Sequence, residues 1–208
     1  MIAFNVKNLC VRFRAAVRPS FSVLLTFISV CSPLVQAKQG IFDGFSLAGW
    51  EVMGDARWSV TNGVLTALGS DGYLATESRY DSYRLQIEFK IDPGTNSGIF
   101  VQCQNRENIS PLTCFEINIW DAHPRPEYST GAIVTLKPPL HKIDTLGGWN
   151  RYDILVASES VKVVLNDVLV SSLDAPDKTS GFIALQRSGQ GKVSFREISL
   201  VPLNQRKN

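Results

Sequence analysis

The sequence has little histidine and cysteine, and it lacks the motifs that assemble these residues into familiar reactive centres. Its 208 residues include two histidines and four cysteines. Paired-cysteine metal motifs, glycine-rich phosphate loops and a serine–histidine–aspartate triad are all absent from it. The sequence therefore gives no indication of a zinc ribbon, a nucleotide-binding loop or a triad hydrolase.

Helical periodicity is also missing. No window of useful length repeats at helical spacing, and there is no long linker, low-complexity tract or internal repeat. Period two is common instead, and it is clearest in 83–91 (YRLQIEFKI), whose odd-numbered residues are all apolar. Further strands are expected at 98–104, 114–120, 131–136, 151–157, 181–186 and 192–200.

Turn signals separate the alternating segments. Asn62-Gly63 and Asn166-Asp167 each lie between two apolar-rich runs, which predicts two β-hairpins. Many short strands without crossover helices are typical of all-β folds. The prediction is a two-sheet antiparallel β-sandwich, a jelly roll.

Acidic residues are missing from the first 37 positions, which contain four basic ones. The apolar run 21–31 and the small residue Ala37 follow, as in a secretory signal, and the run is shorter than the about 20 residues that span a bilayer. We expect cleavage after Ala37, with a lipid anchor at Cys31 or an uncleaved anchor as alternatives. This predicts one exported domain, 38–208, periplasmic or secreted, without stable membrane insertion after cleavage.

Removal of 1–37 leaves 17 of the 21 basic residues and all 19 acidic ones, a net charge of about −2. The remaining chain therefore has no basic excess for nucleic-acid binding. Its two cysteines, Cys103 and Cys114, could form a disulfide in an exported protein. Strict alternation places Cys103 with Val101 but Cys114 with Glu116, so the bond requires a bulge or an irregular connection. Both outcomes remain open.

The stretch 114–124 (CFEINIWDAHP) concentrates polar and aromatic groups. In a strand, one face carries three apolar side chains, and the other carries Glu116, Asn118 and Trp120. An indole beside polar groups suits stacking on a sugar ring, although a solvated face with a rim aromatic fits the pattern equally well. Asp121 and His123 follow. With Glu116 they could hold a divalent metal, but their spacing matches no tight motif.

The two acids in this stretch do not form an obvious pair. In a regular strand Glu116 and Asp121 face opposite ways, about 16 Å apart. Retaining glycosidases require about 5 Å between their carboxyl groups. A bulge near Trp120 would bring Asp121 to the face of Glu116, and E-x-N-x-x-D would then resemble the E-x-D-x-x-E strand of laminarinase-type glucanases.

Other candidates for contacts with a ligand come from separate segments. In 96–102 (NSGIFVQ), Gly98 permits close backbone approach, while Phe100 and Gln102 share a face of the expected strand. If this strand pairs with 114–120, Gln102 lies across from the Glu116 face. Lys137 belongs to a proline-containing loop that could close over a site, or could simply be solvated.

Nine short blocks in order resemble the 3-keto-disaccharide hydrolase domain family over 41–203. They are IFDGFSLAGW, WSVTNGVLTA, NSGIFVQ, FEINIWDAH, TGAIV, GGWNRYDI, VVLNDVLV, GFIALQ and FREISLVPL. The resemblance implies a concanavalin A-like jelly roll in an exported protein that cleaves glycosides oxidised at the third sugar carbon. Gln186 is the residue common at this position in the family. Asn118 replaces a glutamine that is common there, and Gln102 replaces a common arginine.

The implied chemistry needs no carboxylate pair. A ring ketone acidifies the neighbouring C–H bond, so one base can remove that proton and expel the glycosidic substituent, and water then adds. Glu116 or His123 would be the base and Asp121 an acid or metal ligand, with a sugar 3-dehydrogenase as an upstream partner. The alternatives are a noncatalytic carbohydrate-binding module and a laminarinase-type retaining glycosidase. The residues expected to hold the oxidised sugar are Phe100, Gln102, Asn118, Trp120, Lys137 and Gln186.

Overall fold

A computed structural model describes residues 37–174 and 180–203. The predicted signal segment, apart from Ala37, lies outside these residues. The strands are β1 (Gln39–Gly40), β2 (Trp50–Thr61), β3 (Val64–Thr76), β4 (Tyr83–Ile91), β5 (Thr95–Cys103), β6 (Phe115–Ile119), β7 (Asn150–Ala157), β8 (Ser160–Leu165), β9 (Val168–Asp174), β10 (Phe182–Gly189) and β11 (Val193–Pro202). A short 3-10 helix, η1 (Pro126–Tyr128), follows β6. Within the described part of the chain, no helix has the length and hydropathy required to span a membrane.

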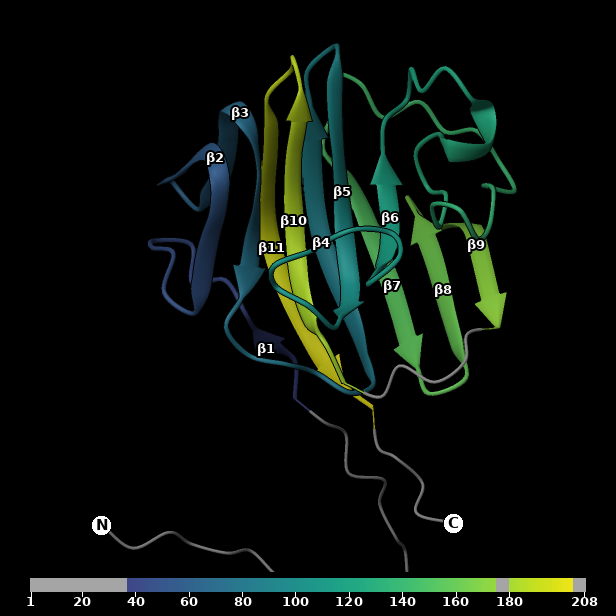
Figure 1. The fold of residues 1–208 in the computed structure, drawn as a ribbon, viewed down its shortest axis with the longest axis horizontal. Helices are drawn as coiled ribbons and strands as arrows, with labels where there is room; N and C mark the ends of the chain where they lie inside the picture. Colours follow the sequence, from purple (N-terminus) through teal and green to yellow (C-terminus); the bar gives the residue numbers. More distant parts are fainter. Residues whose placement is uncertain (1–36, 175–179, 204–208) are drawn as a thin grey trace, which may run out of the picture. The chain divides into compact units, whose positions relative to one another are not determined.

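The strands form two antiparallel layers that share the long β2–β3 hairpin (Figure 1). The second half of β3 pairs with β10, which leads to β5 and β6; its first half pairs with β11, which leads to β4, β7, β8 and β9. Strand β3 passes from one layer to the other near Gly69 and Gly72, and β2 has a bulge between Gly54 and Ala56 opposite this bend. The predicted two-sheet antiparallel sandwich is confirmed.

The main core lies between the two layers. In β4 the odd-numbered residues Tyr83–Ile91 are buried and the even-numbered ones face outward, as the alternation predicts. From the opposite layer, Ile99, Ile117 and Leu185 contribute fully buried side chains to the same core. Because side chains alternate along a strand, their neighbours Phe100, Glu116 and Gln186 must lie on the other side of that layer.

We call this other side the front face; it belongs to β3, β5, β6 and β10. A second apolar cluster lies on it, consisting of Ala75, Phe100, Cys103, Ile109, Cys114, Phe182 and Ala184. Ile109 and Cys114 come from outside the strands, in the segment that follows β5. The front face is therefore partly covered by the chain's own loop.

The hairpin turns match their predictions, but one predicted strand is wrong. Asn62-Gly63 and Asn166-Asp167 have positive φ angles at both positions, as a type I′ turn requires. The segment 131–136 is not a strand, because the chain reverses there: the Lys137 amide donates to the Ile133 carbonyl at 2.8 Å, and Thr135 has a φ of 66°. Ala132 and Ile133 of this segment are buried, and the Val134 amide donates to the Glu116 carbonyl of β6.

Candidate functional site

Glu116 is the most unusual side chain on the front face. It is the second residue of β6 and is 8% exposed. Its carboxyl group has no hydrogen-bond or ion-pair partner among the described residues. Burial without compensation disfavours the charged form and raises the pKa of Glu116 to about 7. A buried acid that titrates near neutral pH is typical of a proton-transfer site.

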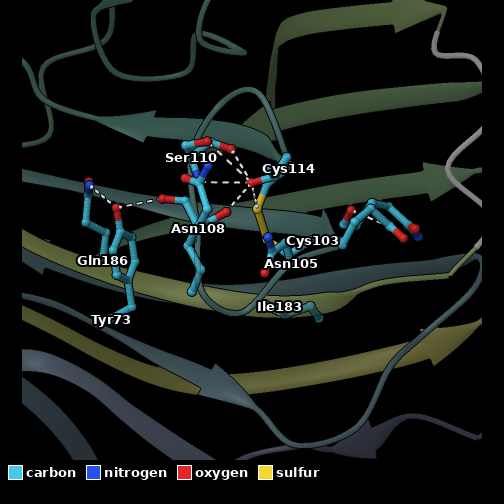
Figure 2. The surroundings of a disulfide bond; sticks show 12 residues. Tyr73, Cys103, Asn105, Asn108, Ser110, Cys114, Ile183 and Gln186 are labelled. Carbon is cyan, nitrogen blue, oxygen red and sulfur yellow. Dashed lines mark hydrogen bonds between the residues drawn. A yellow bond between two sulfur atoms is a disulfide. The ribbon is translucent and has the colours of Figure 1, made fainter.

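Two rows of cross-strand partners lie side by side on the front face. Glu116 pairs with Phe100 on β5, and the neighbouring row runs from Gly98 on β5 through Gln186 on β10 to Tyr73 on β3. The Gln186 amide nitrogen donates to the Tyr73 hydroxyl at 3.4 Å (Figure 2). The amide oxygen of Gln186 is buried and has no hydrogen-bond partner among the described residues, so its capacity as an acceptor is unused.

The segment 104–113 arches over this face, and a disulfide closes its base. Cys103 at the end of β5 is bonded to Cys114 just before β6 (Figure 2). From the arch, the Ile109 carbonyl accepts a hydrogen bond from the Tyr73 hydroxyl at 3.2 Å. The loop is thus anchored at its base by a covalent bond and at its tip by Tyr73.

The disulfide forms because β5 is irregular at Gln102. This residue has a φ of 54°, and the register with β10 shifts between Phe182 and Ala184. The irregularity moves Cys103 to the front face, where Cys114 lies. The expectation that Gln102 lies across from Glu116 is wrong for the same reason: its amide nitrogen donates to the carbonyls of Tyr80 and Asp81, at 3.3 and 2.5 Å.

A cavity of about 340 Å³ adjoins Tyr73. Its lining is Met53, Gly54, Asp71, Gly72, Tyr73, Arg106, Glu107 and Ile109. The Arg106 guanidinium lies 4.5 Å above the Phe182 ring and donates to Glu51 at 3.1 Å and to the Thr76 carbonyl at 2.6 Å. The cavity therefore combines a fixed cation, carboxylates, a phenol and apolar contacts, a mixture that suits a polar ligand with a carbon skeleton.

Two of the predicted site residues hold neighbouring loops. The Asn118 amide nitrogen donates to the Tyr128 carbonyl, and its oxygen accepts from the Ile119 amide at 3.0 Å. The Asp121 carboxylate accepts three hydrogen bonds, from the Thr130 hydroxyl and from the amide and hydroxyl of Thr145, at 2.5 to 2.8 Å. Both polar atoms of the Asn118 amide and both oxygens of the Asp121 carboxylate are therefore engaged within the protein.

Trp120 and His123 form an aromatic group at the end of β6. Their ring centroids are 4.3 Å apart, and the His123 ring also lies edge-on to Tyr128 at 5.5 Å. The Nδ1 atom of His123 accepts the Arg125 amide at 3.0 Å, so a neutral imidazole carries its proton on Nε2. Both rings are partly exposed.

The paired-carboxylate arrangement is not assembled. Strand β6 pairs with β5 without a register shift from Phe115 to Ile119. The Asp121 carboxylate is occupied by Thr130 and Thr145, while the Glu116 carboxyl group has no such partners. Nothing in this geometry supports a retaining-glycosidase pair.

A metal site formed by Glu116, Asp121 and His123 does not fit the structure. Among residues 37–174 and 180–203, no three histidine, cysteine, aspartate or glutamate side chains converge on a common point. Lys137 lies apart in an exposed turn. Of the predicted site residues, the front face brings together Glu116, Phe100 and Gln186, whereas the others lie at its rim or hold loops.

Sequence reasoning missed Tyr73, Arg106 and Ile109. Tyr73 is in a segment, 71–76 (DGYLAT), that contains no motif, and it becomes part of the site only through the pairing of β3 with β10. Arg106 and Ile109 reach the site because the disulfide folds their loop back over the sheet. The only signal for them in the sequence was the pair of cysteines that encloses the loop.

Comparison with known proteins gives a consistent result. The model of a family described as the 3-keto-alpha-glucoside-1,2-lyase-like domain matches residues 38–201. Two predicted glycosyl hydrolases from Parabacteroides distasonis ATCC 8503 are similar in structure. One has 28% identity and a TM-score of 0.71, and the alignment covers 80% of this chain and 100% of that one. The other has 20% identity and a TM-score of 0.69, with 80% and 94% covered.

A more distant likeness shows the fold alone. The β-glucanase of Bacillus licheniformis has 13% identity and a TM-score of 0.54, with 83% of this chain and 100% of that chain covered. It supports the concanavalin A-like, jelly-roll description of the sandwich. A search of curated protein sequences finds no match.

Proposed function

This chain belongs to the 3-keto-alpha-glucoside-1,2-lyase-like domain family, and we propose that it is an exported enzyme that cleaves the glycosidic bond of 3-keto-glycosides such as 3-keto-disaccharides. The observation that carries the proposal is Glu116, a buried and unpaired carboxyl group on the front face with a pKa of about 7. Family membership supports the substrate class, and the environment of Glu116 supports its use as the base that such a substrate needs.

Glu116 is the general base of the proposed reaction. A carboxylate with a pKa near 7 is a stronger base than an exposed glutamate, and about half of it is ionised at neutral pH. It removes the proton from the carbon next to the ketone. The resulting enolate expels the substituent at the neighbouring anomeric carbon, and water adds to the enone that is left.

The other candidates are less suited to this role. Both oxygens of the Asp121 carboxylate are already engaged, because they accept three hydrogen bonds from Thr130 and Thr145. His123 lies in the aromatic group at the rim and contacts Trp120. We assign these two aromatic side chains to contacts with the sugar, and Gln186 to a hydrogen bond with a sugar hydroxyl through its unpaired amide oxygen.

The cellular setting is part of the proposal. The basic and apolar features of 1–37 support export to the periplasm or beyond. A 3-keto-glycoside must first be made by oxidation of an ordinary glycoside at the third carbon. A sugar 3-dehydrogenase is therefore the class of enzyme expected to act before this one.

The test is turnover of a 3-keto-disaccharide by purified protein lacking residues 1–37, followed by chromatography of the released sugars. We expect E116Q to lower kcat by about 10²–10⁴-fold, the usual contribution of a general base. E159Q removes an exposed carboxylate in the β7–β8 turn and should leave kcat unchanged. No loss of substrate with the unmodified protein would refute the proposal, and binding without turnover would indicate a noncatalytic carbohydrate-binding module.

A further inference from the structure

Tyr73 lies between Glu116 and the cavity of about 340 Å³. Its hydroxyl is hydrogen-bonded to Gln186, and Gln186 pairs with Gly98, over which the Glu116 carboxyl group lies. The Tyr73 side chain also lines that cavity. The ring is fixed edge-on against Phe100, with 5.4 Å between the ring centroids. Tyr73 is therefore held at the junction of the two parts of the front face.

Cleavage of a 3-keto-glycoside needs a proton donor as well as a base. The expelled sugar oxygen leaves as an alkoxide, which is a poor leaving group unless it is protonated. Glu116 can return its newly acquired proton only if it reaches both the carbon and the leaving oxygen. A second donor placed on the far side of the reacting bond removes this requirement.

Tyr73 is the side chain on this face that can supply the proton. Burial is the main cause that raises the pKa of its phenol, and the nearby Glu116 charge adds to it, so the hydroxyl is protonated at neutral pH. The Arg106 guanidinium is already engaged with Glu51 and main-chain carbonyls. The 3.2 Å bond from the phenol to Ile109 can be exchanged for a bond to a substrate oxygen by rotation of the hydroxyl.

We propose that Tyr73 is a second catalytic residue that protonates the leaving oxygen, and that the cavity beside it binds the leaving substituent. The inference rests on the proposed function. It divides the site between the oxidised ring, over Gly98 and Glu116, and the leaving group, between Met53 and Ile109.

The step balances without a further reactant. Glu116 takes the proton from the carbon next to the ketone, and the electrons of that C–H bond form the enolate. The enolate re-forms the ketone and breaks the anomeric C–O bond, and the leaving oxygen takes the proton of Tyr73. Water then adds its hydroxyl to the anomeric carbon and gives its other proton to the tyrosinate, while Glu116 returns its proton to the neighbouring carbon.

Gln186 has a defined part in this scheme. Its amide nitrogen points to the Tyr73 oxygen at 3.4 Å and would stabilise the tyrosinate that exists between the two half-reactions. It acts through Tyr73, so in this respect it is a positioning residue.

Leaving groups of different acidity test the role of Tyr73. Y73F keeps the ring that packs on Phe100 and removes only the hydroxyl. We expect it to lower kcat about hundredfold or more for a 3-keto-disaccharide, whose leaving group is a poorly acidic sugar hydroxyl. The loss should be only a few-fold for a nitrophenyl 3-keto-glucoside, whose leaving group needs no proton. E116Q should slow the reaction of both substrates. Y80F, at a partly buried tyrosine that packs against the main core, should slow neither.

The outcomes separate the two proposals. An equal loss for both substrates in Y73F, or no loss for the disaccharide, would overturn the role of Tyr73 while the proposed function stands. Inactivity of the unmodified protein on both substrates would instead refute the proposed function itself.

A space-filling substitution tests the cavity. M53W places an indole in the cavity, whereas V52W places one at the adjacent exposed position, which is not part of the lining. We expect M53W to raise KM for the disaccharide at least tenfold and to leave KM for a methyl 3-keto-glucoside within about twofold, and V52W to change neither. A similar KM increase for both substrates, or no increase for the disaccharide, would show that the leaving group binds elsewhere.

Discussion

The carboxyl group of Glu116 lies against the bare backbone of Gly98: a Cβ atom on Gly98 would be 3.3 Å from the Glu116 Oε1 atom and 3.4 Å from its Cγ atom. The absence of a side chain on β5 thus creates the space in which the acid is buried. Because Gly98 pairs with Gln186 on its other side, the same space connects Glu116 to the row that ends at Tyr73.

An alanine at Gly98 should displace the carboxyl group of Glu116, the proposed general base. The added methyl group would be closer than ordinary contact distance to Glu116 and also 3.2 Å from the Phe100 ring. We expect G98A to fold and to lose about ten- to hundredfold in kcat, since small misplacements of a reacting group cost this much. The matched control is G148A, whose Cβ meets nothing within 4 Å. Full activity in G98A would show that the position of Glu116 is not critical.

Activity should rise with pH through the pKa of Glu116. A general base works in its deprotonated form, and burial places the pKa of Glu116 at about 7. We expect kcat/KM for a 3-keto-disaccharide to increase about tenfold per pH unit below pH 6 and to level off above pH 8. A profile that stays flat from pH 5 to 8 would exclude a base with this pKa.

The same pKa makes stability fall as pH rises. The Glu116 pKa is raised in the folded protein from its ordinary value of 4.5 to about 7, so between these values the folded chain holds a proton that the unfolded chain releases. Below pH 4.5 Glu116 is protonated in both states, and its burial does not lower the free energy of unfolding through ionisation. Between pH 4.5 and pH 7 the free energy of unfolding falls, by about 3 kcal/mol in total. In urea unfolding, the stability difference between E116Q and the unmodified protein should grow by about 2–3 kcal/mol from pH 5 to pH 9. A constant difference would contradict the raised pKa.

The strands of the main core could be predicted from the sequence because each is a local pattern. Residues 83–91 alternate without interruption, and β4 has those bounds. The hairpin at Asn62-Gly63 depends on two adjacent residues that tolerate positive φ, and this preference is also local. No long-range information is needed for either feature.

The front face could be predicted only in part, because it depends on one irregularity and on strand order. The left-handed backbone of Gln102 turns the Cys103 side chain to the front face and the Gln102 side chain away from it, the reverse of what strict alternation predicts. No pattern in the sequence indicates this irregularity. Tyr73 and Glu116 are three strands apart, and no local pattern reveals that β10 pairs with both β3 and β5. Of the polar residues in 114–124, the sequence could not separate the unpaired Glu116 from Asp121, because hydrogen-bond saturation is a property of the tertiary structure.

Asp121 should be important for stability but not for chemistry. Its carboxylate accepts three hydrogen bonds that tie the end of β6 to Thr130 and Thr145. In D121N an amide N–H group faces at least one of these donors, so we expect the free energy of unfolding to fall by about 2–4 kcal/mol. The kcat of the folded variant should stay within about threefold of the unmodified value. D55N, at an exposed aspartate, is the control, and a large loss of kcat in D121N without loss of stability would restore Asp121 as a catalytic candidate.

The disulfide should stabilise the fold and shape the cavity. Cys103 and Cys114 are 11 positions apart, and closing a loop of this length in the unfolded chain is worth about 3 kcal/mol. The double variant C103S/C114S should lose about this much in urea unfolding. Reductant should destabilise the unmodified protein by a similar amount and leave the variant unchanged.

The loop that this bond closes contributes Arg106, Glu107 and Ile109 to the cavity, and Ile109 also holds the Tyr73 hydroxyl. When the base of the loop is released, these groups lose their fixed positions, so KM for a 3-keto-disaccharide should rise at least several-fold. The effect on a methyl 3-keto-glucoside should be smaller, because its leaving group makes few contacts with the loop. KM should be compared for the reduced and oxidised protein at a temperature where both are folded. Equal values would mean that the loop keeps its position without the disulfide, anchored by Tyr73 and by the apolar contacts of Ile109.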